Sequence, residues 1–116
     1  MNHNYINPEA EKYNKLIEKA FNNLNKWIDK SKTAGDYNSP ESAFNAYVNW
    51  ALISLYFSDI LKDKDFNIMK ASIEKTMTRR GFLQFIPFQN ELLRLYYKEQ
   101  KPVADLYPQI IEWTAM

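Results

Sequence analysis

The stretch that decides the fold is "SPESAFNAYVNWALISLYFSDILK", residues 39–62. It opens with a serine followed by a proline, the pairing of an N-cap and a first helical residue that starts a helix. Apolar residues then recur at steps of three and four residues as far as the end of the stretch. This periodicity predicts one long helix that reaches about Lys62.

This predicted helix is apolar on two sides. One face consists of Phe44, Val48, Ala51 and Leu55. A nearly opposite face, whose residues follow a 4-3-4-3 spacing, consists of Ala46, Trp50, Ile53, Phe57 and Ile60. A helix with two apolar sides has to be covered on both of them. The stretch therefore predicts either the central helix of the domain or the seam of a homodimer.

A first helix is expected before it, over residues 8–32. Asn7 suits the N-cap and Pro8 the first helical position. One apolar stripe at helical spacing follows, made of Tyr13, Leu16, Ile17, Ala20, Leu24, Trp27 and Ile28. Gly35 supports a stop a few residues further on.

Three more helices are expected after it. The predicted ranges are 65–80, closed by Gly81, then 87–101, opened by Pro87, and a short terminal helix over 108–116. No segment alternates apolar and polar residues as a half-buried strand does, and the chain has only two glycines for hairpin turns. The predicted fold class is all-α: one domain over residues 1–116, an antiparallel helical bundle of four main helices plus a short C-terminal helix. The second helix is expected to be central, and residues 1–7 are expected to be loose.

The connector "RRGFLQFIPF", residues 79–88, concentrates aromatic side chains where glycine and proline interrupt the backbone. Because an exposed run of this kind would be a sticky patch, we expect it to be buried across one end of the bundle, with Gln84 facing solvent. The alternative is an exposed lip, which would then be the binding site of the chain.

The composition argues against catalysis and against metal or cofactor binding. The chain has no cysteine and one histidine, His3, in the stretch expected to be loose. The sequence from Asp63 to Glu74 has the D-x-D-x-N opening and the twelfth-position glutamate of a calcium loop, but Ile68 replaces the required glycine. We therefore expect a polar turn whose aspartates cap a helix, no cofactor, and no enzyme.

Location and charge restrict the partners. The N-terminus lacks the basic and apolar regions of a signal peptide, and the apolar region 43–61 is too polar to span a membrane, so we expect a cytoplasmic protein without membrane contact. The net charge is +1, but residues 62–101 carry nine basic and five acidic residues. A single-stranded nucleic-acid or nucleoprotein accessory domain that uses the basic region 70–98 is therefore the alternative function. The predicted phosphate contacts are Lys75, Arg79, Arg80 and Arg94, with Phe82, Phe85 or Phe88 stacking on bases.

The favoured interpretation is a non-enzymatic protein–protein interaction module. Its partner is a protein, and the chain itself, as a homodimer or assembly subunit, is the first candidate. Tyrosine, tryptophan and other large aromatic residues are enriched in interface cores. The predicted interface residues are Trp50, Tyr56, Phe57, Phe82 and Phe85.

Overall fold

The computed structural model describes residues 8–115, and every regular element in this range is helical. The elements are α1 (Pro8–Ala20), α2 (Leu24–Trp27), the 3-10 turn η1 (Thr33–Asp36), α3 (Pro40–Ile60), α4 (Asp63–Arg80), α5 (Phe85–Glu99) and α6 (Val103–Thr114). The predicted all-α class is confirmed. His3 and the segment 1–7 lie outside the described residues.

α3 begins where its sequence predicts. The Ser42 backbone N–H donates to the Ser39 hydroxyl oxygen at 3.2 Å, and the Ser39 N–H donates to the Ser42 hydroxyl oxygen at 3.3 Å. These reciprocal bonds satisfy two of the donors that a helix N-terminus leaves free. The helix ends at Ile60, where Leu61 becomes extended, two residues before the predicted end.

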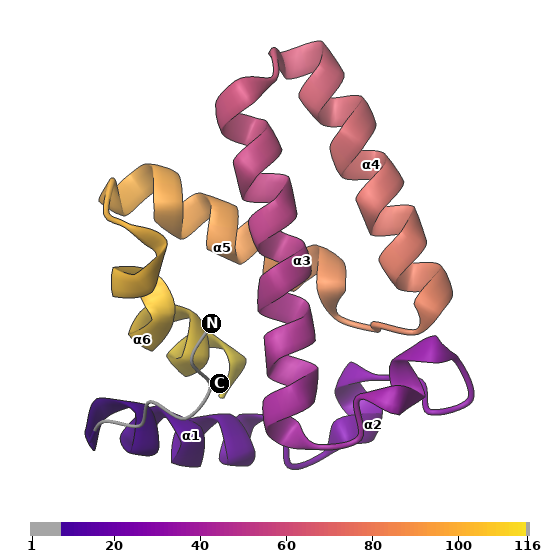
Figure 1. The fold of residues 1–116 in the computed structure, drawn as a ribbon, viewed down its shortest axis with the longest axis vertical. Helices are drawn as coiled ribbons and strands as arrows, with labels where there is room; N and C mark the ends of the chain where they lie inside the picture. Colours follow the sequence, from indigo (N-terminus) through magenta and orange to yellow (C-terminus); the bar gives the residue numbers. More distant parts are fainter. Residues whose placement is uncertain (1–7, 116) are drawn as a thin grey trace.

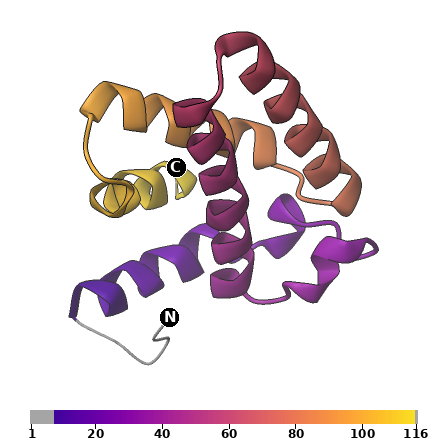
Figure 2. The same ribbon diagram turned by 45° about the horizontal axis from the view of Figure 1, so that its top comes forward.

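α3 packs against α1, α2, α4 and α5, so it is the central helix. Figure 1 shows α3 and α4 as an antiparallel hairpin, while α5 crosses behind α3 and α1 runs crosswise at its lower end. In Figure 2, α1 and α6 lie on one side of α3, and α2 with η1 lies on the other. The predicted antiparallel bundle is therefore not confirmed, because two of the main helices cross α3.

The predicted first helix is wrong beyond Ala20. Phe21 is fully buried, and Trp27 stacks on it with a ring-centroid distance of 4.2 Å. The Trp27 indole N–H donates to the carbonyl oxygen of Ala20 at 3.1 Å and so satisfies the end of α1. In a continuous helix, side chains six residues apart point in different directions. A break at Asn22 and Asn23, two weak helix formers, lets both rings enter the core together.

The connector after α4 is held by backbone hydrogen bonds to the last residue of α2 and to the segment that follows it. Gly81 ends α4 in the left-handed conformation with φ 98°, as the sequence predicts. The Asp29 N–H donates to Gly81 O at 2.7 Å, and the Leu83 N–H donates to Trp27 O at 2.9 Å. Two segments that are distant in the sequence are thereby joined edge to edge.

Burial of the connector is only partly as expected. Phe82 and Phe85 are 2% and 0% exposed, but Leu83 and Ile86 are 51% and 41% exposed. Gln84, expected to face solvent, is half-buried, and its N–H donates to the Tyr47 hydroxyl at 3.0 Å. α5 also begins two residues before Pro87. Because successive side chains of a helix point in different directions, the first turn directs Phe85 inward and Ile86 outward.

Tyr47 lies at the centre of the aromatic core. Its ring centroid is between 5.3 and 6.3 Å from those of five other aromatic residues, namely Phe21, Trp27, Phe82, Phe85 and Phe88. Its hydroxyl donates to the Trp27 carbonyl oxygen and accepts from the Gln84 N–H. One side chain of α3 therefore joins α2, the connector and α5.

A buried polar network joins α3, α5 and α4. Ser54 and Gln89 are both fully buried, and the Ser54 hydroxyl donates to Gln89 Oε1. Gln89 Nε2 donates to Glu74 Oε2 at 2.8 Å, and Lys70 Nζ donates to the same oxygen at 2.8 Å. The network satisfies each buried polar atom it contains, as buried groups require.

α6 is longer than the predicted terminal helix. It begins at Val103, and Pro108, expected to open the helix, lies inside it. Leu106, Ile110 and Ile111 are buried, and α6 packs against α1 and α5. Burial of Leu106 explains the earlier start, because this residue reaches the same apolar face as Ile110 only if the helix already includes it.

Candidate interaction surface

The outer face of α3 carries large apolar side chains that the other described residues leave in solvent. Ile53, Tyr56 and Ile60 are 39%, 61% and 55% exposed. They follow one another at steps of three and four residues, and exposed Asn49 continues the series by one step of four. We call these four residues the outer α3 stripe. It runs along about three turns, or roughly 16 Å, of the helix.

The remaining apolar residues of α3 are covered. The face made of Phe44, Val48, Ala51 and Leu55 is buried. On the other predicted face, Trp50 and Phe57 are half-buried and pack against the core. The Arg80 guanidinium lies 5.2 Å from the Trp50 ring centroid, and the rings of Tyr56 and Phe57 meet edge to face at 5.6 Å.

The predicted interface set is therefore divided by the structure. Tyr56 is exposed in the outer α3 stripe, and Trp50 and Phe57 border it. Phe82 and Phe85 are core residues at 2% and 0% exposure, so their prediction as surface contacts does not fit the folded chain. Both rings are drawn inward because they contact Tyr47.

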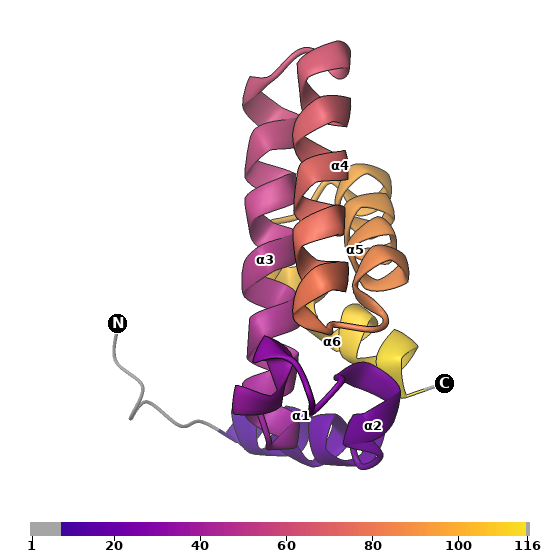
Figure 3. The same ribbon diagram turned by 90° about the vertical axis from the view of Figure 1, so that its right-hand side faces the viewer.

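The surroundings of the outer α3 stripe suit an interface. Figure 3 shows α3 along one side of the molecule, with α4 and α5 on its other side. No member of the stripe is charged, and Asp59, beside Ile60, already accepts a hydrogen bond from the Tyr96 hydroxyl at 3.3 Å. An uncharged apolar centre with a polar margin is the composition of interface cores.

A second surface is a groove between α4 and the start of α5, lined by Glu74, Lys75, Thr78, Arg79 and Ile86. Of the four predicted nucleic-acid contacts, it brings together Lys75 and Arg79. Arg80 instead lies over Trp50, and Arg94 forms an ion pair with Glu91 at 2.6 Å. The sequence signals Lys75 and Arg79 by their spacing of four, but not the apolar floor at Ile86.

The aromatic side chains expected to stack on bases are not at this surface. Phe82, Phe85 and Phe88 are 2%, 0% and 0% exposed. Single-strand binding without stacking would depend on phosphate contacts alone. The nucleic-acid function stays a prediction, without the exposed aromatic side chains on which unpaired bases would stack.

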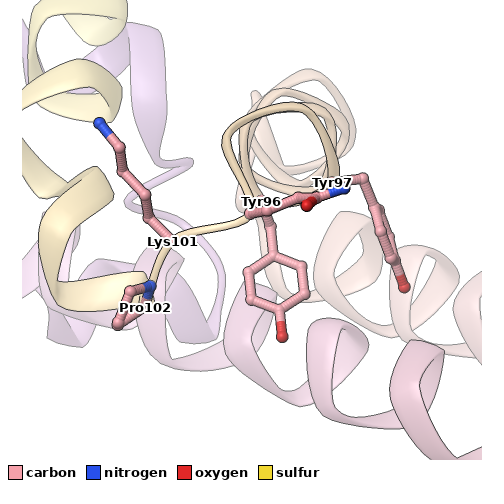
Figure 4. Close-up of a pocket in the computed structure, with 5 residues that line it drawn as sticks. Tyr96, Tyr97, Lys101 and Pro102 are labelled. Atoms are coloured by element: carbon pink, nitrogen blue, oxygen red, sulfur yellow. The ribbon is translucent and has the colours of Figure 1, made fainter.

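A third hollow lies where α5 meets α6, lined by Tyr96, Tyr97, Gln100, Lys101 and Pro102 (Figure 4). The Tyr97 hydroxyl donates to Ser58 Oγ at 2.5 Å, and the negative charge of Asp59 raises the pKa of Tyr96. Figure 4 shows both tyrosine rings pointing away from the Lys101 side chain. These groups hold α5 on the end of α3 and do not converge on a common ligand.

The calcium-loop resemblance of residues 63–74 is not matched by a loop. α4 is helical from Asp63 onwards, so Asp63 and Asp65 lie in its first turn. Carboxylates there interact favourably with the helix dipole. Within the part of the chain that the structure describes, no three His, Asp or Glu side chains are grouped so that they could hold a metal ion.

Comparisons with protein families, curated proteins and solved structures find no match to this chain. Over the described residues, no helix combines the length and the apolar character that crossing a membrane demands. The surfaces described above therefore supply the functional argument.

Proposed function

We propose that this protein is a cytoplasmic, non-enzymatic protein–protein interaction module that self-associates through the outer α3 stripe. The observation that carries the proposal is the exposure of Ile53, Tyr56 and Ile60 in one row on a helix whose opposite face is core. Burying a large apolar side chain stabilises by about 1.5–3 kcal/mol relative to leaving it in water. A row of three such residues favours a covered state.

The spacing of the stripe is compatible with a helix as its partner surface. Steps of three and four residues place side chains in the ridges that interlock when two helices pack. An amphipathic helix is the complementary element, and α3 itself presents an apolar stripe of this kind on its outer face.

A second copy of the chain fits the stripe. The stripe is uncharged, so two copies can meet face to face without repulsion between like charges. Antiparallel pairing with the two Ile53 side chains near the centre places the smaller Asn49 of one copy near the larger Tyr56 of the other. The Asn49 amide and the Tyr56 hydroxyl would then be hydrogen-bonding partners. This is the self-complementarity that a two-fold interface needs.

The non-enzymatic part of the proposal is supported by how the polar groups are used. The buried cluster of Ser54, Gln89, Glu74 and Lys70 is satisfied within itself. Catalytic groups are typically poised for substrate with perturbed ionisation. Here the donors and acceptors already hold three helices together.

The test is sedimentation velocity over a concentration series. A stripe of this length buries less than the roughly 800 Å² per partner of a standard interface, so we expect a dissociation constant on the order of 10–100 µM. The weight-average mass should rise from 13.8 kDa towards twice that value. Ile60→Glu should stay at 13.8 kDa throughout, because it places a charge in the stripe.

The matched control is Ile68→Glu. Ile68 is 63% exposed, but it lies on α4 outside the stripe. This variant should associate like the wild type. A wild type that remains monomeric at millimolar concentration, or equal loss of association in both variants, contradicts the proposal.

A further inference from the structure

The groove between α4 and α5 has a basic rim and an apolar floor. Lys75 and Arg79 are exposed, lie four residues apart on one face of α4, and form no ion pair with another described residue. Ile86 lines the groove and is 41% exposed, and Leu83, three residues before it, is 51% exposed. Two cations and the exposed aliphatic side chain of Ile86 therefore lie together in this groove.

The one carboxylate in the groove does not neutralise this rim. Glu74 Oε2 accepts from Lys70 Nζ at 2.8 Å and from Gln89 Nε2 at 2.8 Å. Its charge is therefore directed towards Lys70 and into the buried network. Lys75 and Arg79 remain as the charges that an incoming ligand meets.

We propose that this groove binds an acidic amphipathic helix of a partner protein. Carboxylates one turn apart on that helix would pair with Lys75 and Arg79, whose own spacing is one turn. Leucine, isoleucine or methionine side chains between them would cover Ile86. Charge complementarity sets the orientation, and the apolar contacts supply the buried area.

The geometry favours this ligand over the other classes. Unpaired bases need exposed aromatic rings, and Phe82, Phe85 and Phe88 are buried. The groove measures about 420 Å³ and is open to solvent along its length, whereas small-molecule sites enclose most of their ligand. An extended surface with charges at its rim suits a segment of polypeptide.

This inference concerns a different surface from the outer α3 stripe and is tested separately. The probe is a fluorescent peptide of about 15 residues, with leucine at steps of three and four and glutamate beside it. A companion peptide carries lysine in place of glutamate. Anisotropy is measured against the wild type and against Ile60→Glu, which should bind equally because the stripe takes no part.

The acidic peptide should bind, and the lysine peptide should not. The double variant Lys75→Glu/Arg79→Glu should weaken binding about tenfold or more and remove its salt dependence. Ile86→Ser should weaken it about threefold or more, because apolar contact is lost. The control Lys98→Glu, at the other end of α5, should stay within about twofold of the wild type.

Three results would overturn the inference. The first is no binding of the acidic peptide to the wild type, and the second is equal binding of both peptides. The third is tighter binding of an oligothymidine of about 15 nucleotides that the double variant abolishes, since the groove would then be a nucleic-acid site. Because Lys75 and Arg79 are exposed, unchanged melting temperatures will show that the double variant is folded.

Discussion

Replacing Tyr47 with alanine is expected to lower the free energy of unfolding by about 4 kcal/mol or more, the largest effect of any single truncation in this chain. Tyr47 is fully buried and contacts five aromatic rings from two separate parts of the sequence, residues 21–27 and 82–88. Its removal leaves a cavity that these rings cannot all move to fill. A domain of this size has a total stability of about 5–15 kcal/mol, so the variant should be close to unfolding.

Tyr47→Phe separates the hydroxyl from the ring. This variant keeps the packing but leaves the Gln84 N–H without its acceptor, which should cost about 1–3 kcal/mol. Urea unfolding of both variants gives the two differences directly. A loss below about 1 kcal/mol for Tyr47→Ala would contradict the position of this residue at the centre of the core.

The hydroxyl also gives a dependence on pH. Burial raises the pKa of the Tyr47 phenol, so the folded state holds its proton more tightly than the unfolded state. The stabilisation is complete below the unfolded pKa of about 10 and is lost as the pH rises above it. Tyr47→Phe should therefore lose less stability than the wild type between neutral and strongly alkaline pH.

The second large effect is expected for Gln89→Leu, which should cost about 2–4 kcal/mol. Leucine fills nearly the same volume, so packing is retained. The Ser54 hydroxyl and the Glu74 carboxylate, however, both lose a partner in or beside the core. An unsatisfied buried polar group costs more than the net contribution of the hydrogen bond that it replaces.

A double-mutant cycle tests whether these groups act together. Ser54→Ala alone leaves the Gln89 carbonyl oxygen unpaired, whereas Gln89→Leu with Ser54→Ala removes both groups. The double variant should therefore cost less than the sum of the single variants, by about 0.5–3 kcal/mol. Arg94→Ala, which breaks an exposed pair with Glu91, is the control and should leave the free energy of unfolding almost unchanged. Strict additivity would contradict the network.

Much of the fold follows from local signals in the sequence. Ser39 and Pro40 start α3 as their residue types predict, and Gly81 ends α4 because a left-handed residue is needed there. The break after Ala20 could not be predicted in the same way. It depends on Trp27 stacking on Phe21 and on hydrogen bonds to the connector at Gly81, which is distant in the sequence.

The candidate surfaces show the same division. The sequence predicts the two apolar sides of α3, and it also predicts that Lys75 and Arg79, four residues apart, share one face of α4. The sequence does not predict which of these apolar residues are covered, because this depends on how far neighbouring helices extend along α3. Trp50 and Phe57 are half-buried, whereas Ile53 and Ile60, from the same predicted face, are exposed. The connector likewise divides into buried phenylalanines and exposed Leu83 and Ile86.

The most direct test of self-association through α3 uses the unmodified chain. Two-dimensional amide NMR spectra recorded from about 10 µM to about 1 mM bracket the affinity expected of so small an interface. Self-association through the outer α3 stripe should shift the amide signals of Asn49, Ile53, Tyr56 and Ile60 with concentration and leave that of Ile68 unchanged. Spectra that do not change over this range, or shifts confined to surfaces away from α3, would contradict it.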